Sequence, residues 1–206
     1  MRIVECIQCQ RFPCTDVRHD RYIIPNVDID PERVSIVLIS ESAPENSADD
    51  YYAPGAPLYA RTTLLAFADA GVQANSIQDL LEQGIYFTSA VKCGKTGYGI
   101  QAKTIEECSR LLEQEIALFP QVRAFLLMGD VAIKAVNYIS KRAGEGRVIP
   151  ASSTYKIRGP AFYFRGARAL PSYLPAGPSF GIKKSKRKMM AEDIAAALAD
   201  ARPQGF

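Results

Sequence analysis

The sequence has no apolar run long enough to cross a membrane, because no stretch approaches the ~18 consecutive apolar residues that a spanning helix needs. Its first 14 residues also lack the apolar centre of a secretory signal and are interrupted by Glu5 and Arg11. We therefore expect a cytoplasmic protein with no membrane partner.

Histidine is almost absent, since His19 is the single histidine of the chain and lies in a polar N-terminal segment. A Ser-His-Asp or Cys-His mechanism would have to use it, and nothing in the sequence places it near a nucleophile. We expect a surface or structural role for His19. No glycine-rich phosphate motif follows the first expected strand, which argues against an enzyme with a nucleotide cofactor.

The overall composition is that of an ordinary globular protein, with 206 residues, of which 48% are hydrophobic and 23% charged. We find no repeat and no linker, and expect a single domain over residues 1–206. Charge is unevenly placed: residues 141–188 hold 12 positive side chains and one acid, Glu145. Such a block is either a solvated basic face or a surface for nucleic acid.

Five cysteines in a reducing compartment favour metal or redox chemistry over disulfides. Cys6 and Cys9 form a C-x2-C pair, Cys14 follows closely, and Cys93 and Cys108 lie far downstream. Thiolates suit iron–sulfur clusters and structural zinc alike. The residues alone leave these two alternatives open.

Short apolar runs alternate with helical patterns along the chain. Four runs predict strands, at residues 35–40, 85–91, 123–129 and 160–167. The segments after them have apolar residues at helical spacing, and Thr104 with Glu107 forms a capping box at the start of one. This alternation predicts an α/β fold, a three-layer αβα arrangement with a central, mostly parallel four-stranded sheet.

Ligands of open α/β sheets bind where the strands end. The first two expected strands lead to Glu41 and Ser89, and the last leads to Ser172. A basic cluster follows, made of Lys183, Lys184, Lys186, Arg187 and Lys188. We therefore expect a carboxylate, hydroxyls and a basic flank at one edge of the sheet.

Several short motifs are spread over nearly the whole chain. They are the N-terminal C-x2-C, V-K-C-G-K after the second strand, E-E-C-S-R-L-L, L-L-M-G-D-V-A and P-S-Y. Together they resemble the uracil-DNA glycosylase superfamily, and within it the iron–sulfur-containing, family 4-like branch. The resemblance implies a uracil-DNA glycosylase-like fold. It also implies a [4Fe–4S] cluster, with zinc as the alternative, held by Cys6, Cys9, Cys93 and Cys108. Cys14 matches no ligand position.

The resemblance also implies roles for residues at the strand ends. Glu41 matches the acid of the family motif G-E-x-P-G, although both glycines are missing here. Ser89 stands in place of the asparagine that commonly contacts uracil, and Leu170 in place of the histidine of an H-P-S motif. The residues implied for base binding are Leu170, Ser172 and, at the position of the stacking aromatic, Leu58, Tyr59 or Tyr52.

The function implied is that of a DNA glycosylase, acting as a monomer on uracil or another deaminated base in single- or double-stranded DNA. Glu41 and Ser89 would be catalytic, and the basic cluster at residues 183–188 would hold phosphates. Because leucine cannot donate a hydrogen bond, an iron–sulfur protein that binds nucleic acid without excising bases is the alternative. An electron carrier is a third hypothesis, in which the basic cluster has no role.

Overall fold

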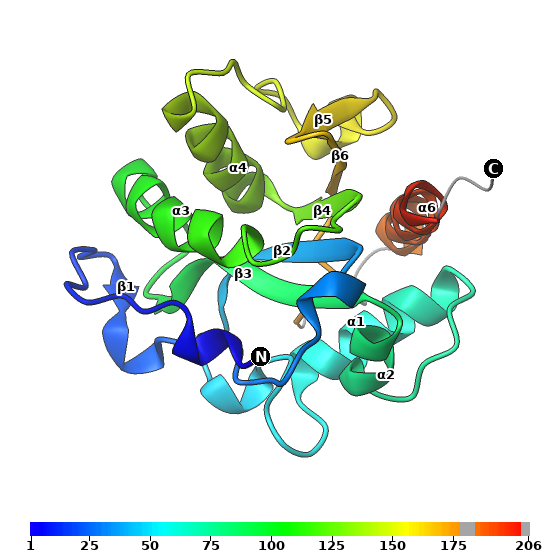
Figure 1. Cartoon of the computed structure of the whole chain (residues 1–206), viewed down its shortest axis with the longest axis horizontal. Helices are drawn as coiled ribbons and strands as arrows, with labels where there is room; N and C mark the ends of the chain where they lie inside the picture. Colours follow the sequence, from blue (N-terminus) through cyan, green and yellow to red (C-terminus); the bar gives the residue numbers. More distant parts are fainter. Residues whose placement is uncertain (178–183, 203–206) are drawn as a thin grey trace.

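A computed structural model of the protein shows one six-stranded sheet with helices on both faces (Figure 1). The structure describes residues 1–177 and 184–202. The strands are β1 (Val17–Arg18), β2 (Ile36–Ala43), β3 (Ile85–Lys95), β4 (Ala124–Met128), β5 (Phe162–Phe164) and β6 (Ala167–Ser172). Their order is β1-β3-β2-β4-β6-β5, with parallel pairing from β3 to β6 and antiparallel pairing at both edges.

The central strands are buried on both faces, and apolar residues predominate in them. In β2, Val37 and Ile39 pack with α3 (Ala102–Ile116) and α4 (Asp130–Arg142) on one side of the sheet. Ile36 and Leu38 pack into the separate core on the other side. This is the pattern of a parallel sheet covered by helices on both faces. It confirms the predicted three-layer α/β fold.

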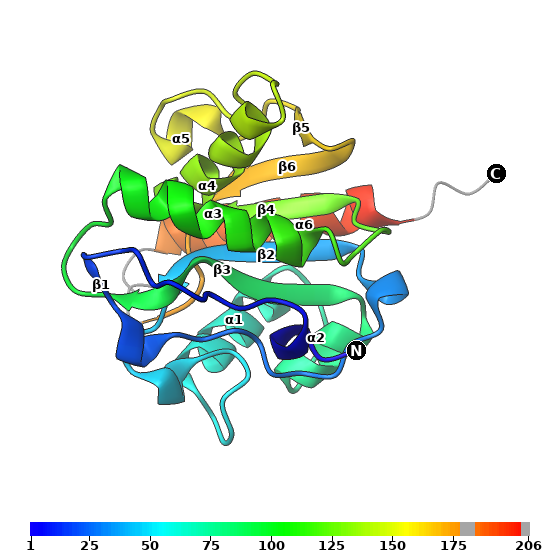
Figure 2. The same cartoon turned by 60° about the vertical axis from the view of Figure 1, so that its left-hand side comes forward.

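Helices α3 and α4 cover one face, and α1 (Leu58–Asp69), α2 (Ile77–Glu82) and α6 (Lys184–Ala201) lie on the other (Figure 2). A one-turn helix, α5 (Thr154–Ile157), precedes β5. The 3-10 turns are η1 (Ile3–Glu5), η2 (His19–Arg21), η3 (Pro31–Arg33) and η4 (Ser47–Asp49). Within the described residues, no helix combines the length and the apolar character that crossing a bilayer requires.

Residues 1–34, here called the N-terminal strap, run along β3 and α3. Ile3 and Ile7 are buried in the core that α3 and α4 cover. The strap then contributes β1, which pairs antiparallel with the end of β3, so that Val17 lies opposite Lys95. The N-terminal segment therefore reaches the carboxyl edge of the sheet.

The predicted number of strands, four, is wrong, because β1 adds one edge strand and residues 160–167 do not form a single strand. Arg165 and Gly166 have φ angles of 51° and 81°, the positive values of a two-residue type I′ turn, and they separate β5 from β6. β6 continues through Pro171 to Ser172, beyond the expected strand at residues 160–167. Proline is tolerated there because β5 pairs only as far as Ala169.

Candidate active site

A crevice of about 620 Å³ opens at the carboxyl ends of the parallel strands. The end of β2, the start of α1, the loop after β6 and the edge formed by β1 and β3 all contribute to it. Its lining includes Arg18, Arg21, Glu41, Glu45, Leu58, Tyr59 and Lys95. The structure thus brings Glu41, Leu58 and Tyr59, three of the predicted site residues, into one cavity at the edge where such sheets bind ligands.

Glu41 lies near the end of β2 and is half-buried. Burial raises the pKa of its carboxyl above the ordinary value; Lys95 and Lys134 oppose this rise, and Asp130 adds to it. The carboxylate fits because Gly129 has no side chain, since a Cβ there would lie 2.5 Å from Glu41 Oε1. A carboxyl with a raised pKa at a strand end is suited to exchange a proton with water.

Leu58 and Tyr59 form the wall where α1 begins. The Tyr59 ring packs 5.4 Å from the ring of Tyr51, measured between centroids. Burial raises the pKa of Tyr59 to about 12, and the carboxylates of Asp50 and Glu41 add to the rise. The Tyr59 hydroxyl therefore keeps its proton at neutral pH and can donate a hydrogen bond.

Ser89 lines a narrow hollow whose lining shares Tyr59 and residues 42–44 with that of the open crevice. The hollow holds about 10 Å³, too little for a base and at the limit for one water molecule. Asp50 lines the same hollow. Its carboxylate accepts the backbone N–H of Tyr52 (3.2 Å), and burial raises its pKa. Asp50 is thus a second acid close to the crevice.

Tyr52, Leu170 and Ser172, three of the residues expected to bind the base, are held by contacts within the fold, and Tyr52 also lines the hollow beside Ser89. The Tyr52 hydroxyl donates to the Phe87 carbonyl (2.9 Å) and accepts the Phe87 N–H (3.0 Å), which holds the ring against β3. Leu170 is buried in the core beneath α6. Ser172 has no exposed surface, and its hydroxyl donates to Asp193 of α6. None of these three residues lines the crevice.

A fully buried ion pair, Lys92 with Glu115, lies behind the hollow. The Lys92 ammonium also donates to Thr88 Oγ1 (2.6 Å) and to the Ser89 carbonyl (2.8 Å), so all three of its donors are used. The second carboxylate oxygen of Glu115 accepts from Tyr86 (2.7 Å) and from Thr88 (2.9 Å). This network fixes the backbone of β3 at Ser89.

The basic cluster lies on the first turns of α6. Its described members are Lys184, Lys186, Arg187 and Lys188, and Lys183 lies outside the described residues. Arg187 forms an ion pair with Asp69 of α1 (2.7 Å), whereas the three lysines are exposed. The helix dipole disfavours cations at a helix N-terminus. The three lysines therefore do not stabilise the helix, and their position is better explained by contact with an anionic partner.

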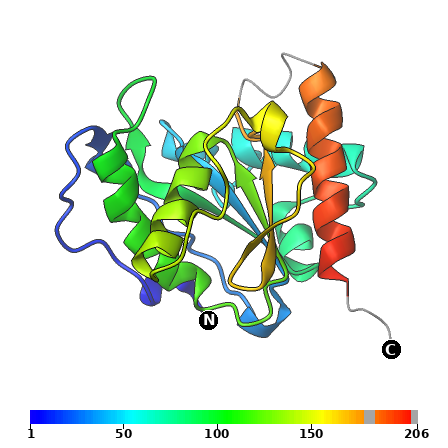
Figure 3. The ribbon, with the colours of Figure 1, turned by 90° about the horizontal axis from the view of Figure 1, so that it is seen from above.

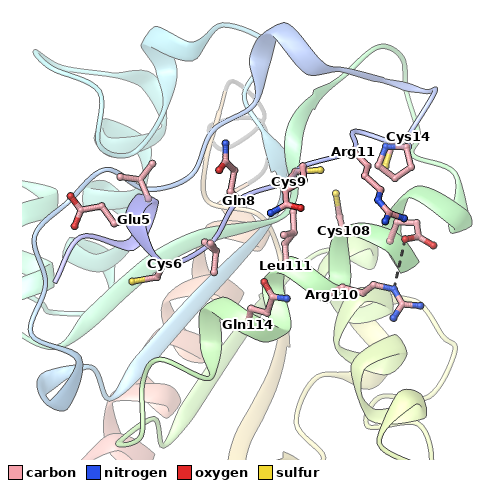
Figure 4. A pocket seen from close by; sticks show the side chains of 15 residues that line it. Glu5, Cys6, Gln8, Cys9, Arg11, Cys14, Cys108, Arg110, Leu111 and Gln114 are labelled. Atoms are coloured by element: carbon pink, nitrogen blue, oxygen red, sulfur yellow. Dashed lines mark ion pairs between the residues drawn. The ribbon is translucent and has the colours of Figure 1, made fainter.

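Four thiols lie near one another between the strap, the end of β3 and α3. Burial raises the pKa of Cys93 and of Cys108 to about 12, and the nearby thiols of Cys14 and Cys9 add to both rises. Cys6 lies apart, with its sulfur directed away from this group and toward a backbone carbonyl (3.5 Å; Figure 4). Within the described residues, no three Cys, His, Asp or Glu side chains are arranged to hold a metal ion.

Several residues near the site were not expected from the sequence. Asp50 is one of several acids in a polar loop, and no pattern distinguishes it. Arg18 comes from the strap, and the pairing of β1 brings it to the crevice. Lys92 stands just beyond Ser89 in the sequence, and only its burial was unexpected, although a charge inside an apolar strand requires a partner. The single histidine, His19, makes a packing contact: its ring centroid lies 5.1 Å from that of Phe12.

Comparison with known proteins connects this site to a family. Residues 28–199 match the family model described as "Uracil DNA glycosylase superfamily". A segment of 58 residues is 33% identical to a Type-5 uracil-DNA glycosylase of Thermus thermophilus, and it covers 28% of this chain and 26% of that protein. The family match includes β2, β3, β4 and the crevice residues Glu41, Leu58 and Tyr59. The chain belongs to the uracil DNA glycosylase superfamily.

Proposed function

We propose that the protein is a DNA glycosylase that hydrolyses the N-glycosidic bond of uracil or of another deaminated base. The observation that carries this proposal is the half-buried acid Glu41 in one cavity with the apolar and aromatic side chains of Leu58 and Tyr59. A cavity of about 620 Å³ is of a size that admits a base. Membership of the superfamily supports DNA as the substrate.

The chemistry of the bond explains why these side chains suit it. Breaking an N-glycosidic bond builds positive charge on the sugar and negative charge on the departing base. The Glu41 carboxylate would orient or deprotonate the attacking water and offset the charge on the sugar. Leu58 would pack against the base, and Tyr59 would donate a hydrogen bond to it. The base reaches the crevice by turning out of the stack.

The basic cluster of α6 would hold the DNA backbone. Lys184, Lys186 and Lys188 are exposed cations beyond the end of β6, and the start of α6 adds partial positive charge. Contacts of this kind fix the position of the protein on DNA without reading its sequence. Their strength falls as salt concentration rises.

The test of this function uses single- and double-stranded oligonucleotides that carry one uracil, incubated with the protein and then treated with alkali. Alkali breaks the strand where a base is missing, so we expect breaks at the uracil position. An oligonucleotide with thymine at that position should stay intact. Salt-sensitive binding without breaks, on every deaminated base tried, would contradict the proposal.

One observation favours a second function, nucleic-acid binding without base excision. Leu170 stands where the family resemblance implies a histidine, and it is buried in the core. The loss of a single donor to the departing base lowers the rate by about 10²–10³-fold. The alkali assay separates the two functions, provided that incubation is long enough to detect excision slowed by this amount.

We also propose that the protein holds a [4Fe–4S] cluster, with zinc as the alternative. The chemistry of the donors supports this, because soft thiols from the strap and from the end of β3 and α3 lie near one another. They are not at ligand geometry within the described residues, so binding would have to bring them closer together. In this proposal the ligands are Cys9, Cys14, Cys93 and Cys108, with Cys14 in the place expected for Cys6. Once bound, the cluster would supply a cross-link between the strap and the sheet.

Serine substitutions distinguish the two candidate ligands. Protein isolated without air is expected to be brown, and Cys14→Ser should lose most of its iron and its visible absorbance. Cys6→Ser should keep both, because the Cys6 sulfur lies apart from the other thiols. Loss of iron in Cys6→Ser together with retention of iron in Cys14→Ser would identify Cys6 as the ligand. Colourless wild-type protein containing zinc would replace the cluster with a zinc site.

A further inference from the structure

Tyr98 is the most exposed large hydrophobic side chain among the described residues, with 107% relative exposure. It lies in the loop between β3 and α3, between Gly97 and Gly99. A Cβ added at either glycine would meet no atom within 4 Å, so the tip of the loop stands clear of the rest of the chain. A single exposed aromatic is ordinary on a protein surface. Two further observations distinguish Tyr98.

The base of this loop is anchored although its tip is free. Besides the pairing of β1 with β3 at Lys95, three hydrogen bonds to Asp16 of the strap anchor it. Its carboxylate accepts the backbone N–H of Gln101 (2.6 Å) and the hydroxyl of Thr104, and its carbonyl accepts the hydroxyl of Thr96 (2.9 Å). Anchoring on both sides of Tyr98 reduces the conformational entropy that is lost when the ring meets a partner.

The loop also lies beside the crevice and carries positive charge. Lys95, three residues before Tyr98, lines the crevice, and Lys103 is exposed on the first turn of α3. Figure 3 shows this loop and the first turns of α6 at the same end of the sheet, on opposite sides. DNA held by the basic cluster of α6 and entering the crevice would therefore have the loop on its other side.

We propose that Tyr98 stacks on an unpaired DNA base adjacent to the nucleotide in the crevice, while Lys95 and Lys103 contact the flanking phosphates. Every base has a π face, so this contact tolerates any sequence, and it requires that the neighbouring base be unpaired. The inference rests on the proposed function and adds to it a preference for single-stranded or locally opened DNA. It assigns the loop between β3 and α3 to substrate binding.

The test measures binding of the full-length protein to a single-stranded oligonucleotide with 2-aminopurine next to one uracil. Tyr98→Ala is expected to raise the dissociation constant about 5- to 150-fold, the effect of losing one stacked base, and to abolish the quenching of 2-aminopurine fluorescence. Tyr98→Phe keeps the ring and should bind and quench as the wild type does. Because the side chain is fully exposed, the melting temperature should not change.

Tyr163 provides the matched control. It is an exposed tyrosine on β5 with 63% relative exposure, and it lies in the hairpin strand that precedes β6, away from the crevice. Tyr163→Ala should alter neither affinity nor quenching. If the wild type binds or excises and Tyr98→Ala does so equally well, this inference is overturned and the proposed function stays intact. A wild type that neither binds DNA nor excises a base would overturn both.

Discussion

Replacing Glu41 with glutamine is expected to lower the rate of base excision by about 10²- to 10⁴-fold, the usual contribution of a general acid or base. Glutamine has nearly the same shape but cannot take a proton from water. Burial raises the pKa of Glu41, so its charged form is disfavoured in the folded protein. The variant should therefore melt at a temperature at least as high as the wild type. Lost activity with retained stability is typical of a catalytic group.

The pH dependence follows from the same pKa shift. The folded protein keeps the Glu41 proton to a higher pH than the unfolded chain does, because its pKa is raised. The stability of the wild type therefore falls as pH rises from the ordinary glutamate pKa through the raised one, and Glu41→Gln lacks this contribution. Excision needs the carboxylate, so its rate should rise over the same interval. Thermal melts and single-turnover rates across acidic pH measure the two effects.

Glu45 offers a matched control for this substitution, because it lines the same crevice from the exposed loop after β2. Glu45→Gln should leave the excision rate close to that of the wild type. Equal losses in both variants would mean that the crevice needs negative charge in general. Full activity in Glu41→Gln would remove Glu41 from the mechanism and make Asp50 the acid to test.

Replacing Lys92 with methionine is expected to lower the free energy of unfolding by about 3–5 kcal/mol, because it leaves the Glu115 carboxylate buried without its cation. Denaturation by urea at neutral pH measures this loss. Since Lys92 also donates to the Ser89 carbonyl, the variant should loosen β3 beside the crevice.

Lys134 provides the comparison, because it forms an ion pair with Asp130 at the surface of α4, where both side chains are at least half exposed. Lys134→Met should cost about 0.5 kcal/mol or less, as exposed pairs of this spacing do. If Lys92→Met is as stable as Lys134→Met, the buried ion pair does not contribute the expected stability, and the remaining contacts of the network are enough to maintain the fold.

The centre of the fold could be predicted from the sequence because its signals are local. β4 and the first four residues of β2 are apolar runs without polar interruption, as is typical of strands buried on both faces. Glu41 could be placed at the edge of the sheet for the same reason, since it closes one of these runs. The helical pattern of α3 was equally clear, because its apolar residues share one face.

What could not be predicted depends on contacts between distant segments. The turn at Arg165 and Gly166 lacks the Asn-Gly or Asp-Gly sequence typical of type I′ turns, so two strands resembled one, and Ser172 was expected beyond the strand rather than within it. A C-x2-C spacing shows which cysteines are neighbours but not which of them face the sheet. The path of the strap decides that, and it brings Cys14 near Cys93 and leaves Cys6 apart from Cys14 and Cys108 (Figure 4).

Gly129 has a consequence for how this site could change over time. It holds φ at +96°, a conformation that other residues rarely adopt, and its missing Cβ leaves the room in which Glu41 sits. Alanine at this position would strain the start of α4 and displace the carboxylate at once. A substitution of Gly129, at the start of α4, could thus remove the function of Glu41 in β2 although residue 41 is still a glutamate.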